Sequence, residues 1–181
     1  MNDETTFSAP WGITLKVITA LLILILVGIA LIGILSGPRQ NIGWILGMIV
    51  LPLVFLITTA FFTIRGYILT PQTLFVKRLG WKSKLDLTNL TSAEADPKAM
   101  SKSIRTCGNG GLFCFAGAFY NRKLGSYRAF ATDPKRAVVL KFTNRTIVVT
   151  PDKPDEFVEK IRAVRNLEKT ITIQPVITRD S

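Results

Sequence analysis

Two long apolar runs, at residues 13–35 and 42–64, restrict the fold of this chain more than any other feature. A helix rises about 1.5 Å per residue, so about 20 apolar residues cross the roughly 30 Å hydrocarbon core of a bilayer. No charged residue lies between Arg39 and Arg65. Two buried helices of a soluble protein are the alternative, but a chain of 181 residues has little other protein to enclose them. We therefore expect a transmembrane helical hairpin.

The charges that flank the runs predict their orientation. The link at residues 36–41, SGPRQN, contains one basic residue and is short enough to join only antiparallel neighbours. The segment after the second run is strongly basic, with Arg65, Lys77, Arg78, Lys82 and Lys84. Because cytoplasmic segments carry the excess of Lys and Arg, we expect the link outside and both termini in the cytoplasm. Residues 1–12 then form an N-terminal cytoplasmic tail, whose acidic Asp3 and Glu4 do not fit a signal peptide.

The rest of the chain, from residue 65, is long enough for one small domain. It carries all but two of the 23 Lys and Arg residues, and the whole chain has a net charge of +11. A basic domain suits an anionic membrane surface or a nucleic acid, and the membrane tether favours the first. Aromatic residues interleaved with Arg resemble single-strand binders, but strand alternation turns such rings inward, so we expect no nucleic-acid partner.

Short alternating segments predict a mostly β domain over residues 65–169 with a terminal helix. The expected strands cover residues 67–70, 73–78, 83–87, 104–107, 112–120, 125–131, 137–142 and 146–150. Residues 91–103 are polar and predict a loop or a short helical turn. A closing helix begins near Pro154, with its apolar face formed by Phe157, Ile161, Val164 and Leu167. Residues 170–181 form a C-terminal tail, either an added edge strand or a mobile end.

The order of these elements, together with two motifs, resembles the bacterial pleckstrin-homology (PH) domain membrane proteins. The motifs are GNGGLF at residues 108–113 and LGSYRAFATDP at 124–134, and the resemblance covers residues 67–165. It implies a PH-like domain, a small barrel of two antiparallel sheets capped by the last helix, attached to the membrane hairpin. It also implies a bacterial inner (plasma) membrane location, but no ligand, because this family lacks a settled activity.

No catalytic or metal-binding pattern is present in the sequence. The glycines at 108, 110 and 111 lack the Gly-Lys-Ser/Thr ending of a phosphate loop, so they predict a backbone turn or close sheet packing, with strand continuing over residues 112–114. Cys107 or Cys114 would need a base to act as a nucleophile, and the chain has no histidine. Two thiols are also too few for a zinc site. We expect a protein that is not an enzyme and that needs no cofactor or metal.

Two groups of basic residues are the candidate binding sites. Lys77, Arg78, Lys82 and Lys84 are predicted to face lipid, in the region where PH domains that bind inositol phosphates place their cations; an ordinary solvated face is the alternative. A second group on the long hairpin is predicted to face a partner: Arg122, Lys123 and Arg128, which Arg105 could join.

The expected function is a two-span, membrane-anchored PH-like domain that binds or scaffolds a protein partner. Recognition of anionic lipid headgroups at the inner leaflet is the alternative. A homo-oligomer is a further option, because Gly43 and Gly47 have the spacing of closely packed membrane helices. The same spacing fits packing of the second helix against the first, around Gly28 and Gly33.

Overall fold

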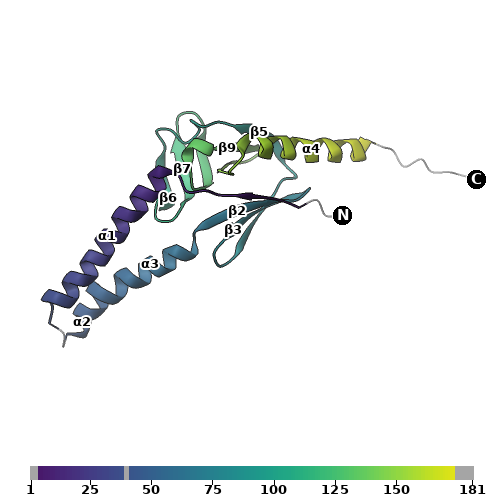
Figure 1. Ribbon diagram of the computed structural model, residues 1–181. Helices are drawn as coiled ribbons and strands as arrows, with labels where there is room; N and C mark the ends of the chain where they lie inside the picture. The colour runs from purple at the N-terminus through teal and green to yellow at the C-terminus, as the bar shows by residue number, and fades with distance from the viewer. Residues whose placement is uncertain (1–3, 39–40, 174–181) are drawn as a thin grey trace, which may run out of the picture.

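The computed structural model describes residues 4–38 and 41–173. Helix α1 spans Ile13–Ser36, and a second rod consists of α2 (Ile42–Ile45), the π-helical turn η1 (Leu46–Val50) and α3 (Leu51–Phe61). The two rods lie close together near the link and separate toward the sheets (Figure 1). The π turn precedes Pro52. Proline has no backbone N–H to donate to the carbonyl four residues back, and the helix adopts the wider π geometry just before it.

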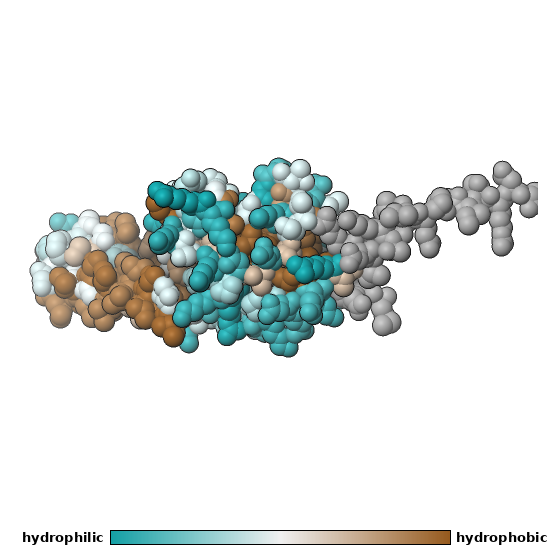
Figure 2. Space-filling view, turned by 90° about the horizontal axis from the view of Figure 1, so that it is seen from above, coloured by the Kyte–Doolittle hydropathy of each residue, from teal (hydrophilic) through white to brown (hydrophobic). Residues whose placement is uncertain are grey.

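Both rods are long and apolar enough to cross a membrane. Their side chains are mostly uncovered by protein. Of the most apolar window of each rod, 17% is buried in the first and 6% in the second. Figure 2 shows this apolar surface over the helices and a mainly polar surface over the sheets. Where the rods touch, a Cβ added at Gly33 would lie 2.8 Å from the Met48 Cβ, whereas Gly28 and Gly47 have nothing within 4 Å.

The second helix ends earlier than the predicted residue 64. Its last turn closes when Phe62 and Thr63 donate backbone hydrogen bonds to Thr59 and Ala60, three residues back. Ile64 is the first residue of strand β2 and is fully buried in the domain core. The apolar character of Ile64 therefore serves protein packing, and a hydropathy pattern cannot distinguish that use from contact with lipid.

The first sheet has the strand order β1-β2-β3-β4, and all its pairs are antiparallel. Its strands are β1 (Thr5–Ser8), β2 (Ile64–Leu69), β3 (Thr73–Arg78) and β4 (Lys82–Asp86). Strand β1 corrects the prediction of a tail over residues 1–12. It pairs with β2 over four residues, and its one apolar side chain, Phe7, is 3% exposed and packs in the core.

The second sheet has the order β5-β9-β10-β8-β7-β6, with β10 and β8 parallel and the other neighbours antiparallel. Its strands are β5 (Leu90–Ala95), β6 (Ile104–Gly110), β7 (Phe115–Asn121), β8 (Gly125–Ala131), β9 (Val138–Phe142) and β10 (Thr146–Val149), with the 3-10 turn η2 (Pro134–Arg136). Strand β5 corrects the prediction of a loop over residues 91–103. Residues 112–114, predicted as strand, form a bend before β7.

Helix α4 (Pro154–Ile173) completes the domain and packs against β5. Asp155 and Glu156 lie in its first turn, where the helix dipole favours negative charge. Phe157 and Ile161 are buried against the core between the two sheets. The helix includes residues 170–173, predicted as tail; the side chain of Leu167 and residues 174–181 lie outside the described part. Two sheets and a capping helix after two long apolar helices confirm the predicted fold class.

Candidate functional site

One loop between β6 and β7, residues 111–114, contacts both helices. On one side of the loop, the Thr19 hydroxyl of α1 donates to the Gly111 carbonyl at 3.0 Å and accepts from the Phe113 amide at 3.1 Å. On the other side, the Cys114 thiol donates to the Phe62 carbonyl just after α3, at 3.3 Å. The loop therefore fixes the domain to both helices.

The glycines of this region are needed for close packing of strands β6 and β7. Gly108 and Gly117 face each other as a cross-strand pair, with φ of +101° and +139°. A Cβ on Gly117 would lie 2.2 Å from the Cys107 carbonyl oxygen, and one on Gly108 would lie 2.4 Å from that of Ala116. The sequence prediction of close sheet packing, rather than a phosphate cradle, matches this geometry.

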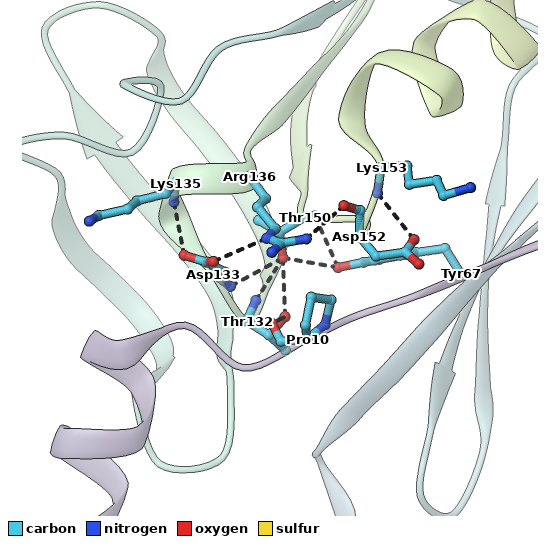
Figure 3. A network of polar contacts seen from close by, with 9 residues as sticks. All are labelled: Pro10, Tyr67, Thr132, Asp133, Lys135, Arg136, Thr150, Asp152 and Lys153. Atoms are coloured by element: carbon cyan, nitrogen blue, oxygen red, sulfur yellow. Dashed lines mark hydrogen bonds and ion pairs between the residues drawn. The ribbon is translucent and has the colours of Figure 1, made fainter.

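A buried hydroxyl network ties the start of α1 to both sheets (Figure 3). The Tyr67 hydroxyl donates to the Phe130 carbonyl at 2.5 Å and accepts from the Thr150 amide at 3.1 Å. Thr150 Oγ1 accepts from the Thr132 amide at 2.8 Å, and the Thr132 hydroxyl donates to the Pro10 carbonyl at 2.9 Å. Every link is buried or partly buried, so the network positions the segment that leads into α1.

Burial of Tyr67 and Cys114 predicts a loss of stability at alkaline pH. Burial raises the pKa of Tyr67 from 10.0 to about 12 and that of Cys114 from 9.0 to about 11. The unfolded chain ionises first, so stability present below pH 9 is lost between pH 9 and 11 for Cys114, and between pH 10 and 12 for Tyr67. Each shift corresponds to about 3 kcal/mol.

Thermal unfolding of the full chain in mild detergent from pH 8 to 11.5 measures this loss. Cys114→Ala should flatten the decline between pH 9 and 11, whereas Cys107→Ala, which removes the exposed thiol, should leave it unchanged. An equal decline in both variants would contradict the assignment of this pH range to Cys114.

The predicted lipid-facing group separates into three exposed lysines and one buried arginine. Lys77 and Lys82 are directly opposite each other on β3 and β4, and Lys84 lies farther along the same face of the first sheet. Arg78 corrects the prediction because it is 9% exposed and points into the domain, on the same side of β3 as Leu74 and Val76. The exposed cations of the predicted group are therefore Lys77, Lys82 and Lys84.

The Arg78 guanidinium lies among three aromatic rings. Its central carbon is 5.8 Å from the ring centroid of Phe62, 5.5 Å from that of Trp81 and 5.5 Å from that of Phe130. One nitrogen, Nη1, donates to the Phe62 carbonyl at 3.3 Å, while Nε has no hydrogen-bond partner. Burial lowers the pKa of Arg78. Its cation–π contacts join the end of α3 to both sheets, which is a structural role.

The predicted partner-facing group does not form one cluster. Arg122 and Lys123 lie in the β7–β8 turn, where the Lys123 ammonium pairs with Asp96. Asn121 beside them donates to the Ala99 carbonyl at 2.8 Å, so the turn lies against the chain after β5 and does not protrude. Arg128 is on β8, exposed, with its guanidinium 5.5 Å from the centroid of Phe130.

An exposed apolar pair on the β6 edge was missed by the sequence analysis. Strand β6 is the last strand of the second sheet in the described part of the chain. Ile104 on β6 is 68% exposed and lies directly opposite Tyr120 on β7, which is 47% exposed. Exposed Cys107 lies on the same strand. From Pro97 to Thr132 the chain has six Lys and Arg residues and no Asp or Glu.

Groups of three or more His, Cys, Asp or Glu residues that could hold a metal ion are absent from the described residues. Cys107 is exposed and Cys114 is buried, and neither takes part in a disulfide. The predictions that the protein needs no cofactor and is not an enzyme stay predictions.

Two sheets that share a core, closed by a terminal helix, are consistent with a PH-like fold. The family model described as Bacterial PH domain matches residues 65–165, more than half of the chain. The chain belongs to the bacterial PH domain family, as the motifs at 108–113 and 124–134 predicted. The matched segment does not include β1, which the structure adds to the first sheet. Comparisons with curated proteins and with solved structures find no match.

Proposed function

We propose that this chain is a two-span protein of the bacterial inner membrane whose PH domain binds a protein partner in the cytoplasm and catalyses no reaction. The uncovered apolar surface of both rods supports the membrane anchor, because helices of a soluble core would be mostly buried. A signal sequence would contain one apolar segment, whereas here two consecutive rods are long and apolar enough to cross a membrane. The orientation rests on the basic residues after the second rod.

The exposed pair of Ile104 on the edge strand β6 and Tyr120 on the neighbouring strand β7 carries the proposal of a protein partner. A sheet edge presents backbone groups with which an extended segment can pair, and neighbouring apolar side chains add specificity. The charged residues from Lys98 to Arg128 in the sequence are all basic, and only Lys123 among them forms an ion pair within the described residues, with Asp96. An acidic segment therefore fits, and a second copy of the same surface would be repelled. The Gly110 end of β6 leads into the loop that contacts the helices, and Ile104 lies at the opposite end of the strand, on the side that would face the cytoplasm.

Cys107 provides a thiol on this strand with which to test partner binding. A thiol-directed cross-linker applied to permeabilised cells should join Cys107 to a protein partner and give a product of higher mass. Ile104→Ser should reduce that product several-fold, because the partner loses its apolar contact. Lys135→Ser, an exposed change at the 3-10 turn, is the matched control and should leave the product unchanged. No higher-mass product, or an equal yield with Ile104→Ser, would contradict the proposal.

Recognition of anionic lipid is the second candidate, and one contact favours it. Lys77 and Lys82 are direct cross-strand neighbours, an arrangement in which like charges destabilise a sheet. A bound anion would remove that repulsion. Both residues lie within four positions of Leu79–Trp81 at the end of the sheet next to α3, so a bilayer that holds α3 has its headgroups close to them.

Lipid that remains bound to the purified full chain tests this candidate. Each cation near an anionic leaflet contributes about 1 kcal/mol, so Lys77→Gln with Lys82→Gln should lower retention of phosphatidylglycerol roughly tenfold or more. High salt should have the same effect on the unchanged protein. The control pair is Lys135→Gln with Lys141→Gln, two exposed lysines on the 3-10 turn and on β9. Equal retention in both double variants would exclude a role for the Lys77–Lys82 pair.

A further inference from the structure

The turn between β3 and β4 exposes large apolar side chains beside the end of α3. Leu79 is 44% exposed and Trp81 is 42% exposed. They continue an apolar surface from Phe61 and Phe62, which are 47% and 40% exposed. Hairpin turns in water are usually built from Gly, Asn, Asp, Ser and Pro, so Leu and Trp at this position require a reason other than turn formation.

The opposite end of the same sheet has ordinary turn chemistry. The β2–β3 turn there contains Pro71 and Gln72, and the β4–β5 turn contains Thr88, whose amide donates to Asp86 at 2.9 Å. The apolar turn is therefore specific to the end of the sheet that adjoins α3. A general tolerance of exposed apolar groups on this sheet would not produce that difference.

The β3–β4 turn is held firmly in place. The Arg78 amide donates to the Trp81 carbonyl at 2.9 Å, and the Leu79 amide donates to the Thr63 carbonyl at 3.2 Å. The Trp81 ring lies edge-on to Phe62, with centroids 4.9 Å apart. The Arg78 guanidinium packs against both rings from the core side. The exposed apolar groups are thus presented on a fixed support next to the helix.

We propose that the β3–β4 turn inserts Leu79 and Trp81 into the interfacial region of the same bilayer that holds the two helices. The inference rests on the proposed function, because it requires α3 to cross that bilayer. The apolar surface of α3 continues directly onto the turn, and exposed Lys77 and Lys82 flank it where lipid phosphates would lie. Tryptophan, like tyrosine, is enriched at this depth. The insertion fixes the PH domain at one angle to the membrane.

Fluorescence quenching by brominated lipid tests the proposal, because the chain has only three tryptophans, Trp11, Trp44 and Trp81. One full-length variant keeps Trp81 (Trp11→Phe, Trp44→Phe), and another keeps Trp44 in the link-side helix (Trp11→Phe, Trp81→Phe). Both are reconstituted in phosphatidylcholine vesicles with bromine on the acyl chains close to the headgroup. We expect the emission of each variant to fall to less than half of its value in lipid without bromine.

The outcomes separate this inference from the proposed function. Quenching of Trp44 without quenching of Trp81 would overturn the insertion and leave the helical anchor intact, whereas absence of both would overturn the anchor itself. Protection of Trp81 from both brominated lipid and aqueous acrylamide would mean that a protein covers the turn, which also overturns insertion. In the Trp81-only variant, Leu79→Asp should at least halve the quenching, while Gln72→Asp in the opposite turn should not change it.

Discussion

Replacing Gly117 with valine is expected to unfold the PH domain at growth temperature. The new Cβ would lie 2.2 Å from the backbone oxygen of Cys107, and φ of +139° is a conformation that a β-branched residue does not tolerate. The neighbouring strand would have to move, because the clash is with backbone. A loss of about 3 kcal/mol or more follows from the strain together with the disrupted β6–β7 pairing.

Gly125 provides the matched control for this prediction. It also has positive φ, +67°, but a Cβ there meets nothing within 4 Å. Gly125→Ala should therefore cost only the conformational term, about 1 kcal/mol. Thermal unfolding of the full chain in detergent, followed by near-ultraviolet circular dichroism, compares the two variants. Similar unfolding temperatures for Gly117→Val and Gly125→Ala would contradict the close β6–β7 contact.

Phe157→Ala is expected to detach α4 from the sheets. The side chain is fully buried, and its ring lies 5.0 Å from Phe7 and 6.3 Å from Tyr67, centroid to centroid. Truncation of a buried phenylalanine costs about 3–5 kcal/mol, a large part of the stability of a domain of this size. The same ring holds β1 in place, so hydrogen exchange should accelerate in Thr5–Ser8 as well as in α4.

Glu159→Ala is the control on the same helix, because Glu159 is exposed. It should leave both the unfolding temperature and the exchange in β1 almost unchanged. If Phe157→Ala accelerated exchange in α4 alone, then β1 would be held by its backbone pairing with β2, and the ring contact with Phe7 would not matter.

The sequence predicted the helices and most strands because their signals are local. An apolar run can be recognised from its own residues, whereas β1 can be recognised only together with the strand that pairs with it. Its four residues include one large apolar side chain, and its partner β2 lies about 60 positions away in the chain. Strand β5 was missed for another reason. A register shift between Leu90 and Ser92 breaks the alternation of buried and exposed residues that identifies a strand.

The candidate site was predicted less well, because charge in a sequence does not reveal which side of a strand it occupies. Arg78 follows Leu74 and Val76 at intervals of two residues, so strand alternation alone could have placed it inside and Lys77 outside. The exposure of Ile104 could not have been predicted in this way. It depends on β6 being the edge of its sheet, because β5, the strand before it in the chain, pairs with the distant strand β9 instead.

Labelling from the two sides of the membrane tests the two-span anchor most directly. Ser36 at the end of α1 is exposed, as is Cys107 in the PH domain. A membrane-impermeant maleimide applied to intact spheroplasts should label Ser36→Cys in a Cys107→Ala background at once. It should label the native Cys107 only after the membrane is permeabilised. Labelling of Cys107 from outside, or equal labelling of both positions before permeabilisation, would contradict an anchor with the link outside and the domain inside.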